Sequence, residues 1–543
     1  MSFFNIVSSK IEAIFIMYLK FEGVDFAQGE WLRRADRPDL GDIQCNEAMR
    51  LARVVNMKPL EFAVLLVKDL KELQINKLDI FEDVSIAGGG FINMKLSLPC
   101  MLSYFKENFV DNSIADMLVI PKEDRKRIIV DYGSPNIAKP LQVGNMRSVI
   151  IGEAILNMLT TLGHDVIPDN HIGDWGRPVG IIIAMLTEDE KYKCFLSQNI
   201  DDFKDCKIDF NKIPPLYIKG SQRIRDDKEF LEKVRCYTEK LQAREKGFMA
   251  IWEQLIYGTS KNLKKQFMDL GCPIIADAPL RGESYFQDSA IEIIEKIKSH
   301  YLVKKDEGAI IVDLKHKNLV PPILVNRDGA LTYFATDLAT LVQNDKDGFD
   351  IGLYVVDDRQ SLHFEQLFTV AKILNLCPNG IKTRHIKFGT YNGIDGKPMK
   401  SRSGESLILE DFLTGTAYSP LDIRWLEMQN DHTKNVVFNP EELSIVDKSS
   451  ILEWTALSVH KPVEELDDSS PREQKQLLID MFYSLFVFRR YIESDSHQLI
   501  LADLVVVTKS LQGYFDPTHG QDKLVNKAVE LLQVGFKSLN LTE

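Results

Sequence analysis

Two groups of polar residues have a spacing that could support chemistry. Tyr333 and Asp337 are four residues apart, so on a helix a hydroxyl and a carboxylate would project from one face toward one ligand. The loop from Gly133 to Pro140 follows a strand-like run and precedes a long helical pattern. Phosphates bind at such junctions because unpaired N–H groups and the helix dipole converge there. Taken alone, the Tyr/Asp pair is more typical of a hydrogen bond on a helix surface.

The elements that must position these residues follow the order of a parallel sheet. Residues 127–132 form a charge-bounded apolar run typical of a buried strand, 150–162 carry apolar residues at helical spacing, and 165–167 form the next strand. This order predicts a right-handed crossover whose loop lies at the carboxyl edge of the sheet. Residues 351–356, 361–376 and 385–390 repeat the strand–helix–strand order. Two such halves predict an α/β fold with a doubly wound parallel sheet, a Rossmann-type domain.

Five segments resemble motifs of the arginyl-tRNA synthetases, a class I aminoacyl-tRNA synthetase family, and they occur in the family's order. They are Asp131–Arg147 (DYGSPNIAKPLQVGNMR), Asn170–Gly176 (NHIGDWG), Tyr333–Thr340 (YFATDLAT), Asp358–Phe364 (DRQSLHF) and Gly396–Gly404 (GKPMKSRSG). The first contains the position of the class I HIGH tetrapeptide, and the last resembles the family's degenerate KMSKS loop. Any one match would be weak, but the ordered set is specific.

The resemblance implies a class I catalytic domain that binds arginine. Arginine's guanidinium is a planar fork of donors, so a selective pocket needs acidic or amide acceptors held rigidly for bidentate contact. The family holds the amino acid with residues at the positions of Asp131, Asn136, Tyr333, Asp337 and Gln360, and we carry these roles over. Within its motif, the Tyr333–Asp337 pair is therefore interpreted as part of a substrate pocket.

The implied reaction begins with attack of arginine's carboxylate on the α-phosphorus of ATP, which gives arginyl adenylate and pyrophosphate. The arginyl group then passes to the 2′-hydroxyl of the terminal adenosine of tRNA(Arg). Such chemistry depends on positioning and on positive charge against the phosphates. The candidate catalytic residues are Lys139, Gln142, Asn145, Lys400 and Arg402, and the candidate ATP-binding residues are Gly144, His171, Gly173, Asp174 and Lys400. Mg²⁺ is expected to arrive with ATP, and no protein-bound metal is expected.

Two of these candidates have specific physical arguments. Gly144 would let the backbone approach the nucleotide closely, because a side chain there would block it. His171 is a plausible ligand-contacting group, with a satisfied histidine that orients a loop as the structural alternative.

The chain departs from the family pattern in its tetrapeptide and in its tail. Gln142 and Asn145 occupy positions that are normally histidine, and an amide can donate a hydrogen bond but cannot carry an imidazolium charge. Loss of one transition-state donor typically costs about 2.7 to 4 kcal/mol. The segment after Arg402 is also short for the family's helical anticodon-binding domain.

Three functions therefore stay open at this stage. The first is an arginine–tRNA ligase. The second is a paralogue that activates arginine for another acceptor, and the third is a non-catalytic synthetase-like protein that binds tRNA or arginine. Tyr333, Asp337 and Gln360 fit all three functions, so only the tetrapeptide and the tail distinguish them.

Length and composition predict a multidomain globular protein, with 543 residues of which 45% are hydrophobic and 27% charged. The expected domains are an α+β domain at 1–115, a catalytic domain at 120–415 with an insertion at about 188–320, and a helical, anticodon-binding-like domain at 416–543.

In the first domain, residues 40–73 recur with a helical period, and 86–98 are typical of a strand pair broken by Gly88–Gly90. In the last domain, 505–511 and 524–539 carry the clearest helical stripes.

The net charge of −13 opposes nonspecific nucleic-acid binding, so an RNA site would need a local basic patch. No apolar run reaches the roughly 20 residues of a membrane span. The seven cysteines lack the spacing of a zinc cluster or a disulfide framework. We therefore expect a cytoplasmic protein without membrane contact, and the resemblance implies a monomer.

Overall fold

The computed structural model describes most of the chain and divides it into two compact units. These comprise residues 1–121 with 446–538, and residues 122–445 with 539–543. The described residues are 3–21, 31–35, 37, 39–109, 111–137, 141–197, 199–327, 329–393, 396, 408–415, 419–429, 433–437, 471–489, 523–539 and 541. Residues 416–543, expected to form one domain, contribute to both units. The three-domain boundaries stay a prediction.

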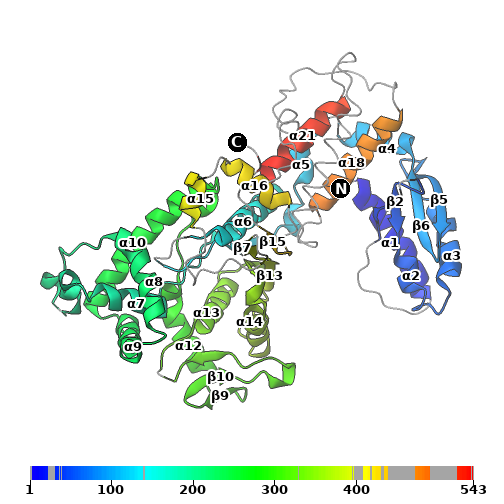
Figure 1. The fold of residues 1–543 in the computed structure, drawn as a ribbon. Coiled ribbons are helices and arrows are strands. Elements are labelled where there is room, and N and C mark those ends of the chain that lie inside the picture. Colours follow the sequence, from blue (N-terminus) through cyan, green and yellow to red (C-terminus); the bar gives the residue numbers. More distant parts are fainter. Residues whose placement is uncertain are drawn as a thin grey trace. The chain divides into compact units, whose positions relative to one another are not determined.

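The first unit contains an antiparallel sheet covered by helices (Figure 1). The sheet order is β1 (Arg33–Arg34), β2 (Ile43–Cys45), β6 (Phe91–Leu96) and β5 (Phe81–Ala87). The strand pair expected around the Gly88–Gly90 turn is confirmed. The helical interpretation of residues 40–73 is correct for α2 (Glu47–Leu51) and α3 (Pro59–Lys71), but wrong for Ile43–Cys45. Those residues pair with β6, and such a distant partner leaves no local periodic signal.

The remaining helices of this unit come from both ends of the chain. They are α1 (Phe3–Phe21), α4 (Leu98–Asn108), α5 (Ile114–Leu118), α18 (Pro471–Arg489) and α21 (Lys523–Ser538), and a short hairpin joins β3 (Gln74–Ile75) to β4 (Leu78–Asp79). The buried Asp480 of α18 accepts a hydrogen bond from Arg34 Nη1 at 2.5 Å. The helical stripe expected at 524–539 is confirmed as α21, while the stripe at 505–511 lies outside the described residues.

The second unit contains the predicted parallel sheet. Its order is β13 (Lys382–Phe388), β12 (Ile351–Asp357), β7 (Arg127–Asp131) and β8 (Asp165–Asp169), all parallel. Helix α6 (Val143–Thr161) connects β7 to β8, and α14 (Ser361–Ile373) connects β12 to β13. The two crossovers run in opposite directions along the sheet, so right-handed connections place their helices on opposite faces. The doubly wound fold is confirmed, and its switch point lies between β7 and β12.

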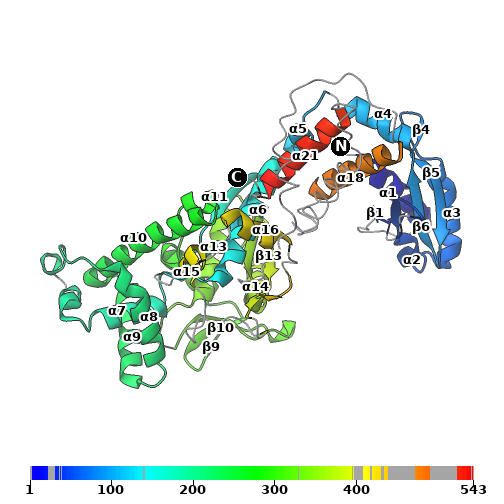
Figure 2. The ribbon, with the colours of Figure 1, turned by 45° about the horizontal axis from the view of Figure 1, so that its top comes forward.

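Helix α13 (Tyr333–Lys346) determines where the predicted ligand-binding pair lies. It immediately precedes β12 and packs beside α14, so its N-terminal end lies at the carboxyl edge of the sheet (Figure 2). Buried residues Leu338, Leu341 and Val342 join the core that contains Tyr354 and Leu367. The apolar face thus fixes the helix, while its first turn carries polar side chains to the sheet edge.

Helices dominate the insertion between the two crossovers, with a small antiparallel sheet of order β11-β10-β9 near its end. The elements are α7 (Arg177–Leu186), α8 (Ile213–Arg223), α9 (Lys228–Gln242), α10 (Lys246–Asp269), α11 (Pro273–Asp277), α12 (Gln287–Ile297), β9 (Val303–Asp306), β10 (Ala309–Val312) and β11 (Ile323–Val325). After β13 come β14 (Tyr391–Asn392), α15 (Leu409–Gly415), α16 (Pro420–Gln429) and β15 (Val436–Val437).

None of the described helices is both long and apolar enough to cross a membrane.

Candidate active site

The carboxyl ends of β7, β8 and β12 place one row of polar side chains across the sheet. Asp131 is in register with Asp169 on one side and with Tyr354 on the other. Asp131 Oδ1 accepts a hydrogen bond from Ser134 Oγ at 2.5 Å. Burial and, after it, the negative charge of Asp169 raise the pKa of Asp131 to about 7. The Asp131 carboxyl therefore changes charge near neutral pH.

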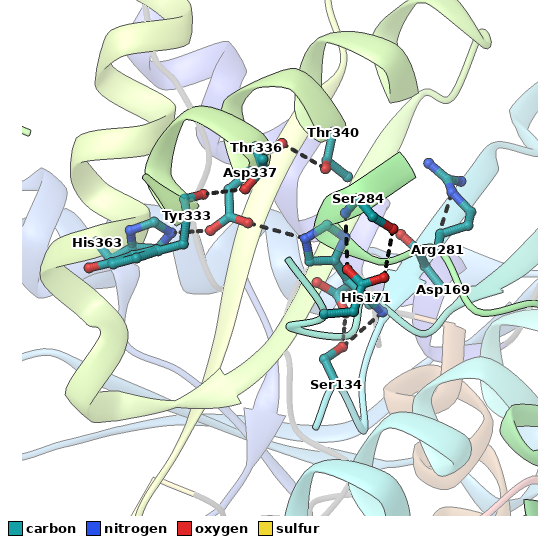
Figure 3. A network of polar contacts seen from close by, with 12 residues as sticks. Ser134, Asp169, His171, Arg281, Ser284, Tyr333, Thr336, Asp337, Thr340 and His363 are labelled. Atoms are coloured by element: carbon teal, nitrogen blue, oxygen red, sulfur yellow. Dashed lines mark hydrogen bonds and ion pairs between the residues drawn. The ribbon is translucent and has the colours of Figure 1, made fainter. Parts of the chain in front are cut away.

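The carboxylate of Asp337 lies between two imidazoles (Figure 3). Its Oδ2 is 2.7 Å from His363 Nε2 on α14, and its Oδ1 is 3.3 Å from His171 Nε2 after β8. The Asp337 side chain is 22% exposed, so the pair of contacts does not seal it from a ligand. Three segments that are distant in sequence thus meet at one carboxylate.

Opposing effects set the charges of this cluster. Burial would raise the pKa of Asp337, but the hydrogen bonds and positive charges of His171 and His363 outweigh it and lower the pKa to about 2. Burial would lower the pKa of His171, but Asp337, Asp131 and Asp169 together raise it to about 10. At neutral pH the Asp337 carboxylate is therefore anionic and His171 is cationic.

Backbone hydrogen bonds join the loops after β7 and β8. Ile137 N donates to Gly173 O at 3.0 Å, and Gly173 N donates to Pro135 O at 3.1 Å. These bonds place Asn136 beside Gly173 as an isolated parallel bridge. A Cβ atom at Gly173 would lie 2.7 Å from Asn136 Oδ1, so only glycine leaves room for this amide. Two predicted site residues are thus brought together.

Asp174 connects the loop after β8 to a 3-10 helix far along the chain, Glu283–Phe286. Its buried carboxylate accepts hydrogen bonds from Ser284 N at 3.0 Å and from Ser284 Oγ at 2.6 Å. The neighbouring Glu283 has its pKa raised to about 7, first by burial and then by the charge of Asp337. Asp174 thus positions the loop in this structure, and its ATP-binding role stays a prediction.

Tyr333 and Gln360 lie at the starts of α13 and α14, the two helices that carry Asp337 and His363. Tyr333 begins α13, is 60% exposed, and holds its ring 5.1 Å from the His363 ring, centroid to centroid. Gln360 directly precedes α14 and is exposed. Both side chains are exposed, and their arginine-binding roles stay predictions.

The predicted nucleotide-binding side is described only in part. Gln142 N donates to Asn145 Oδ1 at 2.9 Å, which caps the start of α6. The position where Gly144 would carry a Cβ has no heavy atom of the described chain within 4 Å. This open space fits the expected close approach of a nucleotide. Lys139, Lys400 and Arg402 lie outside the described residues.

Several residues of the polar cluster around Asp337 were not predicted from the sequence. His363 lies within the DRQSLHF segment, where a helix places it one turn after Gln360, but nothing in the sequence links it to Asp337. The other unanticipated members are Ser134, Asp169, Glu283 and Ser284. Ser134 was within a recognised motif, whereas Glu283 and Ser284 come from the insertion and carried no local signal.

Comparisons with known proteins cover nearly the whole chain. The model of class I (R) tRNA synthetase catalytic domains matches residues 112–449, and that of the arginyl tRNA synthetase N-terminal domain matches residues 5–96. A Francisella tularensis arginine–tRNA ligase is 34% identical over 382 residues, which are 70% of this chain. The chain spans about 64% of the length of that curated relative.

Two further comparisons extend along the full chain. An arginine–tRNA ligase of Agathobacter rectalis is 29% identical over 548 residues, covering 99% of this chain and 86% of that protein. The crystal structure of an arginyl-tRNA synthetase from Plasmodium falciparum has a TM-score of 0.74 at 18% identity, covering 99% of this chain and 98% of that chain. This second likeness establishes a shared fold.

Proposed function

The chain belongs to the arginyl-tRNA synthetase family, and we propose that it is an arginine–tRNA ligase that uses L-arginine, ATP and tRNA(Arg). The observation that carries the proposal is the Asp337 carboxylate, anionic and partly exposed at the switch point of the sheet. Open α/β sheets bind their ligands at this place. A guanidinium is the substrate group that suits such a carboxylate best.

Recognition of arginine would use two anionic positions. The guanidinium would donate to Asp337, with the exposed Tyr333 covering it from the same helix face. Asp131, in the next part of the sheet edge, would attract the α-ammonium group together with the neighbouring Asn136 amide. The α-ammonium group is common to all amino acids, so discrimination would rest on the planar guanidinium and its contact with Asp337.

Activation would join arginine's carboxylate to the α-phosphorus of ATP as pyrophosphate leaves with Mg²⁺. Gly144 and the N–H groups at the start of α6 face the space where the nucleotide would approach. Lys139, Lys400 and Arg402 would supply positive charge to the phosphates. The arginyl group would then transfer to the 2′-hydroxyl of tRNA(Arg), releasing AMP. We propose that the protein acts as a monomer in the cytoplasm.

The decisive experiment is arginine-dependent exchange between ATP and labelled pyrophosphate, measured with and without tRNA(Arg). Exchange together with charged tRNA supports the proposal. Exchange without charging would instead indicate an acceptor other than tRNA(Arg). Bound arginine with no exchange under either condition would refute the ligase and favour a non-catalytic binding protein.

A further inference from the structure

Arg147 is completely buried near the start of α6, and its hydrogen bonds in the described chain do not include Asp337 or the two histidines beside it. Its Nε lies 2.8 Å from Glu427 Oε1, and both side chains are 0% exposed. Its Nη1 donates to two backbone carbonyls, Gly389 O at 2.7 Å and Lys434 O at 3.0 Å. One guanidinium thus contacts three separate segments of the second unit.

These segments surround the carboxyl end of the edge strand β13. Gly389 directly follows β13, Lys434 precedes β15, and Glu427 belongs to α16. A Cβ at Gly389 would lie 2.3 Å from the carbonyl carbon of Lys434, so the two backbones touch. Tyr391 of β14 also donates its hydroxyl hydrogen to Glu427. The contacts form a compact junction with Arg147 at its centre.

Helix geometry connects this junction to the open space at Gly144. Arg147 follows Gly144 by three residues, so the two positions are neighbours on the α6 surface, one turn apart. A second link lies just before the helix, where Leu409 N donates to Leu141 O at 2.8 Å. The first turn of α6 is therefore held from both sides by chain that follows β13.

We propose that Arg147 is a positioning residue for ATP, which it serves by fixing the first turn of α6 against the end of β13 and against α16. This inference rests on the proposed function for the ATP site at the first turn of α6 and for the kinetic consequence, and ATP binding is measured separately from the ligase reaction. Arg147 does not need to touch the nucleotide. A displacement of about 1 Å in such a support can lower a reaction rate about a hundredfold.

The test must separate positioning from simple stability. Replacing a whole buried ion pair by apolar residues is often neutral for stability, whereas removing one partner leaves an unpaired buried charge. The informative variant is therefore the double substitution Arg147→Met with Glu427→Leu, accompanied by Arg147→Lys. Lysine keeps the charge but cannot reach Glu427 and both carbonyls with one planar group.

Arg424→Met is the matched control. Arg424 is a second buried arginine and lies on α16, the helix that carries Glu427, but its Nη1 donates to Leu270 O directly after α10 and not to the chain that follows β13. All variants are compared in thermal unfolding, in ATP affinity by calorimetry, and in kcat and KM of pyrophosphate exchange.

We expect the double variant and Arg147→Lys to bind ATP at least tenfold more weakly and to lose about a hundredfold in kcat, with the arginine KM unchanged. Arg424→Met should keep the wild-type ATP affinity at a comparable unfolding temperature. A folded double variant with wild-type ATP affinity and kcat would overturn the inference, as would an equal loss in Arg424→Met. If the wild type binds ATP without any exchange, the ligase proposal fails, while the ATP affinities still decide the role of Arg147.

Discussion

The two sides of the candidate site are built from different chemistry. On the side proposed to bind arginine, Asp337 lies between two imidazoles, and the pKa values of Asp337, His171 and Asp131 are all displaced. On the nucleotide side, the first turn of α6 offers backbone N–H groups, open space at Gly144, and an amide cap between Gln142 and Asn145.

The two sides differ in the positions at which histidine occurs. The tetrapeptide positions that are histidine in the family pattern are amides here, while His171 and His363 flank the carboxylate of Asp337. Charge is therefore concentrated where a cationic amino acid would bind. In the proposed mechanism, phosphate binding would rely instead on the start of α6 and on Lys139, Lys400 and Arg402, so the two sides should respond differently to substitution.

The largest expected effect is a selective loss on the arginine side. Asp337→Ala removes the carboxylate that would meet the guanidinium, and truncating one partner of a buried charge pair costs about 2 to 5 kcal/mol. Arginine affinity should fall about thirtyfold to several-thousandfold, with ATP affinity unchanged. Calorimetry with each ligand measures this, and Asp306→Ala on the exposed β9 surface is the control. An equal loss for both ligands would refute the assignment of Asp337.

The next effect concerns the nucleotide side. Gln142→His combined with Asn145→His should raise kcat of pyrophosphate exchange by about tenfold to a hundredfold, because imidazole can donate with positive charge where an amide cannot. The arginine KM should not change. The substitution also removes the cap from Asn145 to Gln142, so the unfolding temperature is measured in parallel. An unchanged kcat in a stable variant would mean that these positions do not limit the reaction.

A smaller effect is expected from pH. Because the pKa of Asp131 is about 7, its carboxyl is mostly protonated at pH 6 and mostly ionised at pH 8, while Asp337 stays ionised throughout. Arginine affinity should therefore rise about tenfold between these pH values. Asp131→Asn should bind weakly and lose most of this dependence, with a remainder from Glu283, whose pKa is also about 7. A pH-independent affinity in the wild type would contradict the role of Asp131.

The smallest effect tests the fit between the two loops. Gly173→Ala would place a methyl group against Asn136 Oδ1 and turn this amide away from the pocket. We expect the arginine KM to rise about threefold, since the Asn136 contact is one neutral hydrogen bond of about 0.5 to 1.5 kcal/mol. Gly89→Ala, whose added methyl meets open space, is the matched control. Identical KM values for both variants would argue against Asn136 as a contact.

The sequence predicted the elements that have strong local patterns. The apolar run of β7, the helical stripe of α6 and the second crossover all lie close to their expected bounds, because burial on both sheet faces leaves a continuous signal. Strand β2 was missed because Ile43–Cys45 depends on pairing with β6, nearly fifty residues later.

The candidate site was predictable only as separate segments. Asp131, Asn136, His171, Gly173 and Asp337 do come to one edge of the sheet. Which side chains pair there is a tertiary property, and the contact of His363 with Asp337 joins residues 26 positions apart on two helices. The bonds of Asp174 to Ser284 likewise link residues 110 positions apart, so no local pattern could distinguish a ligand-binding carboxylate from one that holds a loop.

The two backbone bonds between Pro135–Ile137 and Gly173 extend the pairing of β7 and β8 past the ends of the strands. Neither loop can then rearrange alone, because each supplies the other's hydrogen-bonding partner. The conformational entropy of these loops is lost when the protein folds, so ordering them does not reduce the free energy of substrate binding. A ligand that touches Asn136 would consequently find the loop that carries His171 already in place.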